Sequence, residues 1–77
     1  PAQAIFEGDF VVLLVPVDDE QPMTEVAAAV AHHVVGKRVP AQDRPMQVSY
    51  NGVVLADDAT LAGEGIAPLE VLRVAYA

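Results

Sequence analysis

The longest apolar run in the chain covers Phe10 to Val17, which reads Phe-Val-Val-Leu-Leu-Val-Pro-Val and carries no hydrogen-bonding side chain. A strand that is covered on one side alternates apolar and polar residues, because successive side chains point to opposite faces. This run does not alternate, so it predicts a strand with two apolar faces. A chain of 77 residues has enough helix to cover one face, and a second protein is the expected cover for the other.

A hairpin is predicted around this run. Ala4 to Glu7 is a short apolar segment, and Gly8-Asp9 supplies a tight turn before Phe10. Pro16 has no N–H for a strand ladder, so the second strand lies at a sheet edge or ends there. The pattern leaves the outward parity open, but Pro16 favours one set of candidate interface residues, namely Phe10, Val12, Leu14 and Pro16, over the alternative set with Val11 and Leu13.

After the long apolar run, the spacing of apolar residues changes to the period of an amphipathic helix. Apolar residues fall at intervals of three and four at Met23, Val26, Ala27, Val30 and Val34. Pro22 suits the first turn, Glu25 complements the positive end of the helix dipole, and Gly36-Lys37-Arg38 supplies a stop with basic residues. This segment is the main helix of the predicted fold.

The second half of the chain predicts a further hairpin and a last strand. Met46 to Tyr50 alternates, Asn51-Gly52 is a strong turn signal, and Val53 to Leu55 follows. Leu61 to Glu64 is expected to form one helical turn. In the last strand, Leu69 to Tyr76, one face carries Leu72, Val74 and Tyr76 and the other carries Val71, Arg73 and Ala75.

The resulting order is strand, strand, helix, strand, strand, helical turn, strand, which is the order of the β-grasp or ubiquitin-like fold. Tyr50 to Leu55, Asp57 to Leu61 and Gly65-Ile66 resemble ubiquitin in particular. We therefore expect an α+β protein in which a mixed sheet of four to five strands packs on one main helix. Residues 1–77 are expected to form a single ubiquitin-like domain.

The composition of the chain limits the kinds of partner that it is expected to bind. The net charge of −7 argues against nucleic acid, because phosphate backbones are bound mainly by clustered lysine and arginine. The acidic turns, Asp18 to Glu20 and Asp57-Asp58, predict solvated loops or docking to a basic patch on a partner. The absence of cysteine permits a reducing cytoplasm but does not reveal the compartment. The chain has no long apolar stretch and no secretory signal, so a cytoplasmic protein without a membrane partner is expected.

Candidate catalytic chemistry is sparse. His32 and His33 are neighbours on the predicted helix, so their rings point about 100° apart and are not expected to bind one metal ion. His33 is expected beside the apolar stripe and His32 nearer the surface. Ser49, the one serine, lies within a predicted strand and has no triad partners. We expect no catalytic, cofactor-binding or metal-binding residue on this chain.

Two other kinds of ubiquitin-like protein are possible. A protein modifier or sulfur carrier acts through a flexible C-terminal Gly-Gly, whereas this sequence reads Val74-Ala75-Tyr76-Ala77 at that position, and Tyr76 is expected to pack. A free-standing ubiquitin-like adaptor, which binds its partner transiently, stays open as the alternative function.

A set of dispersed motifs resembles one family. These are Glu7 to Phe10 leading into the apolar strand, Val17-Asp18, Met23 with Glu25 to Ala27, Val30-Ala31, His33, Lys37 to Val39, and later Pro68, Glu70-Val71 and Val74. They are similar to the small γ subunit, system protein B, of the toluene monooxygenase hydroxylases among the bacterial multicomponent di-iron monooxygenases.

The resemblance implies a non-catalytic accessory subunit that docks on the large catalytic subunit, with a β subunit, in an (αβγ)2 assembly. It also implies that the di-iron centre belongs to the large subunit. Toluene, xylene, isoprene and other alkenes all remain open as substrates of the parent enzyme, since this sequence departs from the toluene proteins in its more apolar long strand and its Asn51-Gly52 turn.

Overall fold

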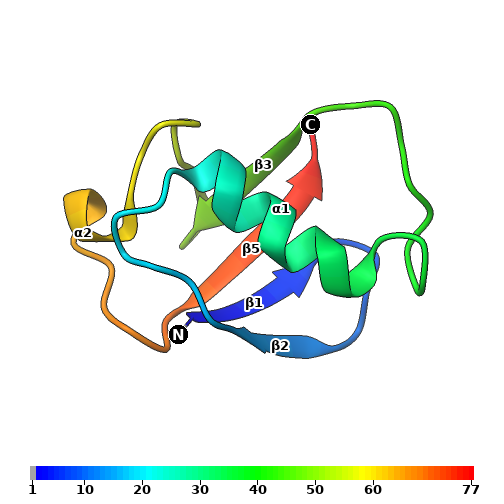
Figure 1. Cartoon of the computed structure of the whole chain (residues 1–77), viewed down its shortest axis with the longest axis horizontal. Coiled ribbons are helices and arrows are strands. Elements are labelled where there is room, and N and C mark those ends of the chain that lie inside the picture. Colours follow the sequence, from blue (N-terminus) through cyan, green and yellow to red (C-terminus); the bar gives the residue numbers. More distant parts are fainter. Residues whose placement is uncertain (1) are drawn as a thin grey trace.

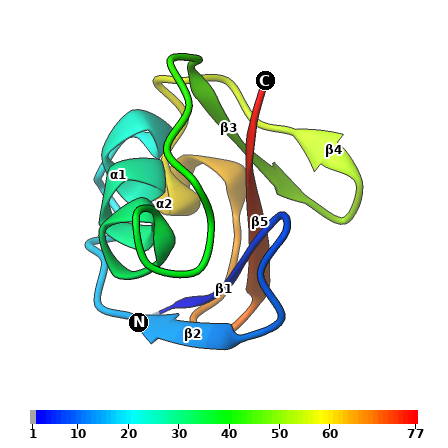
Figure 2. The same ribbon diagram turned by 90° about the vertical axis from the view of Figure 1, so that its right-hand side faces the viewer.

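The computed structural model describes residues 2–77 and consists of a five-stranded sheet with two helices on one side (Figures 1 and 2). In chain order the elements are β1 (Ala2–Phe6), β2 (Val12–Val15), α1 (Met23–Val34), β3 (Met46–Tyr50), β4 (Val53–Val54), α2 (Leu61–Glu64) and β5 (Val71–Tyr76). The strand order is β2-β1-β5-β3-β4, and only β1 and β5 run parallel. The prediction of an α+β, β-grasp fold with a mixed sheet on one main helix is confirmed.

α1 begins at Met23 and ends at Val34, as its apolar period predicts. Pro22 is the residue before the first turn rather than part of it, and its side chain makes no capping hydrogen bond. Backbone carbonyls accept the first helical N–H groups instead, because Met23 N donates to Ala59 O at 2.9 Å and Thr24 N donates to Asp57 O at 3.2 Å. The helix N-terminus is therefore held by the loop that precedes α2.

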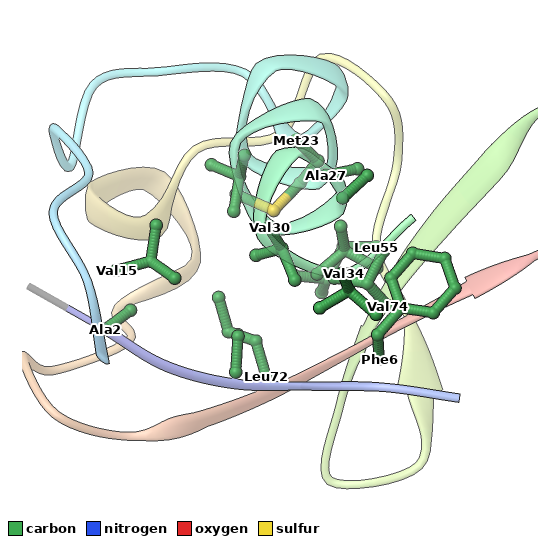
Figure 3. Packing of buried hydrophobic residues seen from close by; sticks show 14 of the residues in the cluster. Ala2, Phe6, Val15, Met23, Ala27, Val30, Val34, Leu55, Leu72 and Val74 are labelled. Carbon is green, nitrogen blue, oxygen red and sulfur yellow. The ribbon is translucent and has the colours of Figure 1, made fainter. Parts of the chain in front are cut away.

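The core lies between α1 and the inner face of the sheet (Figure 3). It takes alternate residues from the strands and the three-and-four stripe from the helix. Its largest fully buried side chains are Phe6, Met23, Leu72, Val15, Val26, Val30, Val34, Val48 and Val74. Phe6 also meets the ring of Tyr76 edge to face, with centroids 5.6 Å apart, so Tyr76 packs as expected.

Several strand limits differ from the sequence predictions. β1 begins at Ala2 rather than Ala4, because Ala2 and Gln3 pair with Val15 and Leu14 of β2. β2 keeps only four of the eight residues from Phe10 to Val17. β5 begins at Val71 rather than Leu69, since Leu69 has a left-handed backbone with φ of 69°. Pairing partners that are distant in sequence set these limits.

The second hairpin turns at the predicted dipeptide. Asn51 has φ of 51° and Gly52 has φ of 80°. Two successive positive φ angles are the signature of the type I′ turn, whose twist suits a two-residue hairpin. β4, however, ends at Val54 instead of Leu55, and the buried Leu55 joins the core.

Candidate interaction surface

The face of the sheet turned away from the helices forms the candidate surface, which we call the outer face. Cross-strand register aligns its residues in rows: Val12, Ile5, Arg73, Ser49 and Val54 form one, Leu14, Gln3 and Val71 the next, and Ala75 and Gln47 a third. Both helices lie on the opposite side of the sheet (Figure 2). This leaves β1, β2, β3 and β5 each with one covered and one uncovered face, whereas both residues of β4 are exposed.

Apolar side chains gather on the β2 half of the outer face. Val12 and Leu14 of β2 are 51% and 64% exposed, and Val71 of β5 is 41% exposed. Ile5 of β1 lies opposite Val12 and is half-buried. On β3, by contrast, the outward positions are Gln47 and Ser49. One uncovered apolar surface therefore follows β2, β1 and β5, and a second exposed apolar pair, Val53 and Val54, lies on β4 at the opposite edge.

The four candidate interface residues are all exposed, and two of them, Val12 and Leu14, lie on the outer face of β2. Phe10 is 89% exposed, and Val12, Leu14 and Pro16 are also exposed. Val15 points into the core, and Leu13 packs partly against it. The run from Phe10 to Val17 thus has two apolar faces, as its composition predicts, and α1 covers only one of them.

Sequence reasoning missed Ile5 and Val71 as parts of this surface. The alternation of apolar residues in their segments was visible, but it does not say which strands are neighbours. That information comes from the parallel pairing of β1 with β5, which joins residues about 68 positions apart, such as Gln3 and Val71.

The acidic turn Asp18 to Glu20 is exposed and also has a structural role. The Asp18 carboxylate accepts a hydrogen bond from Glu20 N at 2.9 Å, and Asp18 N donates to Gln21 Oε1 at 2.8 Å. Asp19 accepts through its carbonyl from Ala62 N at 2.9 Å, which fixes the start of α2. The turn that follows β2 is therefore ordered and acidic.

Two carboxylates have specific partners. The Arg38 guanidinium beside Asp9 holds the pKa of that carboxyl below its ordinary value, and the hydrogen bond is the main cause. Tyr50 donates its hydroxyl hydrogen bond to Glu70, which raises the pKa of Tyr50. Both pairs join segments far apart in sequence, so they act as structural clamps.

The histidine pair is exposed at the end of α1. The ring centroids of His32 and His33 are 5.4 Å apart and the ring planes meet at 74°. His33 is exposed rather than sheltered beside the apolar stripe, which corrects the expectation for that residue. Within residues 2–77, no group of three or more histidine, aspartate or glutamate side chains could hold a metal ion.

The last described residues are held in the sheet. β5 is the central strand, flanked by β1 and β3. Beyond it, Ala77 N donates to Pro45 O at 2.8 Å, and Arg44 Nε donates to Ala77 O at 2.8 Å. These contacts hold the backbone as far as Ala77 against the segment that precedes β3.

A small, mainly apolar hollow of about 70 Å³ lies on the α2 side of the molecule. Val17, Leu61, Ile66 and Pro68 line it, with Asp19 at its border. The hollow is far too small for a substrate pocket, since such pockets usually have several hundred Å³. In the part of the chain that the structure describes, no helix is long and apolar enough to cross a membrane.

Comparisons of the sequence with known proteins agree on one family. Residues 1–76 match the family described as toluene-4-monooxygenase system protein B. The chain is 38% identical to the toluene-4-monooxygenase hydroxylase γ subunit of Ectopseudomonas mendocina, over 99% of this chain and 93% of that protein. It is 41% identical to the alkene monooxygenase oxygenase γ subunit of Xanthobacter autotrophicus, over 82% of this chain and 67% of that protein.

A solved structure agrees with these relatives. A chain from a toluene 4-monooxygenase complex with the inhibitor 4-bromobenzoate superposes with a TM-score of 0.95 at 38% identity, covering 100% of this chain and 96% of that chain. The fold and the sequence thus indicate the same relationship, and the chain belongs to the toluene-4-monooxygenase system protein B family.

Proposed function

We propose that this chain is the non-catalytic γ subunit of a bacterial soluble di-iron monooxygenase hydroxylase and that it docks on and stabilises the large catalytic subunit. The observation that carries the proposal is its similarity to γ subunits of two such systems along nearly the whole chain. The uncovered apolar half of the outer face supports it, because a small acidic domain has no use of its own for such a surface.

The proposal assigns the chemistry to other chains. The di-iron centre and the substrate channel belong to the large subunit, and no residue of this chain binds a cofactor or acts in catalysis. A β subunit completes each unit, two units form the (αβγ)2 assembly, and the assembly resides in the cytoplasm. Aromatic hydrocarbons and alkenes are both candidate substrates of the parent enzyme, since the relatives come from a toluene and an alkene system.

The interface is placed on the β2 half of the outer face, with Phe10, Val12 and Leu14 at its centre and Pro16 at its end. Covering the parts of Phe10, Val12, Leu14 and Val71 that are now exposed would contribute on the order of 4 to 7 kcal/mol before the costs of association are subtracted. This surface is thus the main apolar part of a larger contact, in which the acidic turns Asp18 to Glu20 and Asp57-Asp58 meet basic groups of the partner.

The test is co-purification of the tagged chain with the large subunit from a co-expressing host. Val12→Asp with Leu14→Asp should abolish co-purification, while circular dichroism and urea unfolding of the isolated variant stay near those of the parent. Gln47→Asp with Ser49→Asp is the matched control, because it adds the same charge at the two polar outward positions of β3 on the same face. Retained assembly in the first variant would place the interface elsewhere.

The alternative is a free-standing ubiquitin-like adaptor. One observation favours it: the buried apolar residues pack against one another in a core made from the chain's own helix and strands, so the interior of the described fold is closed without a partner. Sedimentation of the chain expressed alone separates the two functions. A stable monomer with no tendency to aggregate and no affinity for the large subunit would favour the adaptor.

A further inference from the structure

The two edges of the sheet are protected very differently. β4 forms one edge and has only two residues, and a very short edge strand is one of the ordinary defences against pairing with another chain. β2 forms the other edge, has four residues, and lies in a run without any charged side chain. Lysines and inward-pointing charges commonly protect an edge strand from pairing with another chain. The run between Phe10 and Val17 has neither.

The backbone of β2 has a partner on one side only. It pairs antiparallel with β1 from Ala2–Val15 to Ile5–Val12, and within residues 2–77 no other segment donates to it or accepts from it. In antiparallel pairing, every second residue directs its N–H and C=O away from the neighbouring strand. β2 therefore presents free backbone groups along an apolar edge, and Figure 2 shows this strand at the border of the sheet.

We propose that an extended segment of the large hydroxylase subunit adds to the free edge of β2 as a sixth strand of the sheet. The inference rests on the proposed function and specifies how the contact is made. Backbone hydrogen bonds then supply the pairing, and alternate side chains of the added segment lie beside Val12 and Leu14 on the outer face. Pro16 lacks an N–H and marks the end of the paired region.

Charge argues against a second copy of this chain as the occupant. Self-pairing centred on β2 would place Val12 opposite Val15 and, further along, Asp18 of one copy beside Asp9 of the other. Arg38 offsets Asp9, but the exposed Asp18, Asp19 and Glu20 remain, and each copy carries a net charge of −7. The same charges favour a partner segment that is apolar along β2 and carries lysine or arginine next to Asp18 to Glu20.

Proline substitutions test the backbone pairing. Neighbouring residues direct their N–H groups to opposite edges, so one of Leu13→Pro and Leu14→Pro removes a bond to β1 and the other removes a free-edge donor. Each is compared with alanine at the same position, which matches the loss of the side chain. The variant that matters is the one that loses a free-edge donor, and it is recognised because it keeps the bond to β1 and stays folded. This variant should bind the large subunit at least about tenfold more weakly than its alanine control, and equal binding would overturn the proposal.

Hydrogen exchange of the parent chain gives a second readout that does not depend on a variant folding. In the complex with the large subunit, the outward amides of β2 should exchange at least about tenfold more slowly than in the free chain, and unchanged exchange would overturn the proposal. Failure of the parent chain to bind the large subunit would instead overturn the proposed function. A dimer of the free chain that is lost in the same proline variant would assign the edge to a second copy.

Discussion

The side chains of Arg38 and Asp9 form a bidentate ion pair that joins two segments 29 residues apart in the sequence. Arg38 Nε lies 3.0 Å from Asp9 Oδ1, and Arg38 Nη2 lies 3.0 Å from Asp9 Oδ2. Asp9 belongs to the turn between β1 and β2, whereas Arg38 follows α1. The pair therefore ties the beginning of the long apolar run to the C-terminal end of the helix that covers its inner face.

The ion pair predicts a component of stability that is lost in acid. Because the pKa of Asp9 is lower in the folded chain than its ordinary value of 3.8, the folded state is favoured while Asp9 is ionised. This contribution is fully present above that ordinary value and is lost as the pH falls below it, through the folded pKa. Thermal unfolding of the isolated chain at a series of pH values from about 7 to about 2 measures the loss.

Asp9→Asn isolates this component from the other carboxylates. The variant should be less stable than the parent chain near neutral pH, and the difference between the two melting temperatures should shrink as the solution is made strongly acidic. A difference that is independent of pH would show that the asparagine side chain disturbs the turn itself and that the charge of Asp9 contributes nothing.

Leu72→Ala tests the core at its central strand. Leu72 is fully buried in β5, so removing its side chain beyond the β-carbon leaves a cavity and should cost about 2 to 5 kcal/mol of unfolding free energy. Urea unfolding measures the change. Val71→Ala is the control on the opposite face of the same strand and should cost well under half as much in the isolated chain, because Val71 is uncovered there.

Local chemistry made part of this structure predictable. The three-and-four stripe of α1 and the Asn51-Gly52 turn depend on residues close in sequence, and both agree with the structure. The β-grasp order followed from the succession of such elements. Leu69 lay outside this reasoning, since nothing in its neighbourhood indicates a left-handed leucine before a strand.

The candidate surface was predictable only strand by strand. The placement of Pro16 selected Phe10, Val12 and Leu14 as outward, and these residues are exposed. Their neighbours on the outer face depend on pairings between segments far apart in sequence, and no local pattern specifies those. The Asp9 to Arg38 pair was missed for the same reason, since the sequence suggested that Arg38 complements the helix end.

Thr60→Ala tests the short helix α2. The Thr60 side chain accepts a hydrogen bond from Gly63 N at 3.0 Å and caps the helix. Its removal should cost about 1 kcal/mol of unfolding free energy. Thr60→Ser retains the hydroxyl and should stay within about 0.5 kcal/mol of the parent chain. Equal losses in the two variants would show that the methyl group, rather than the cap, matters.

Leu69→Gly should stabilise the isolated chain. Leu69 has φ of 69°, a left-handed conformation that costs a leucine on the order of 1 kcal/mol and costs glycine little. Its carbonyl accepts a hydrogen bond from Gln3 Nε2 at 2.8 Å, so the loop is held against β1 in this shape. Glycine relieves the strain but adds freedom to the unfolded chain, which leaves a gain of roughly 0.5 kcal/mol in urea unfolding.

The same variant separates strain from function. Leu69 is 51% exposed and stands two residues before Val71, at the border of the outer face, so a strained apolar side chain there is of no benefit to the free chain. If the side chain contacts the large subunit, Leu69→Gly should weaken assembly while raising stability. Leu69→Ala, which keeps the left-handed cost and loses the side chain, should weaken assembly without the gain. Unchanged assembly in both variants would place Leu69 outside the interface.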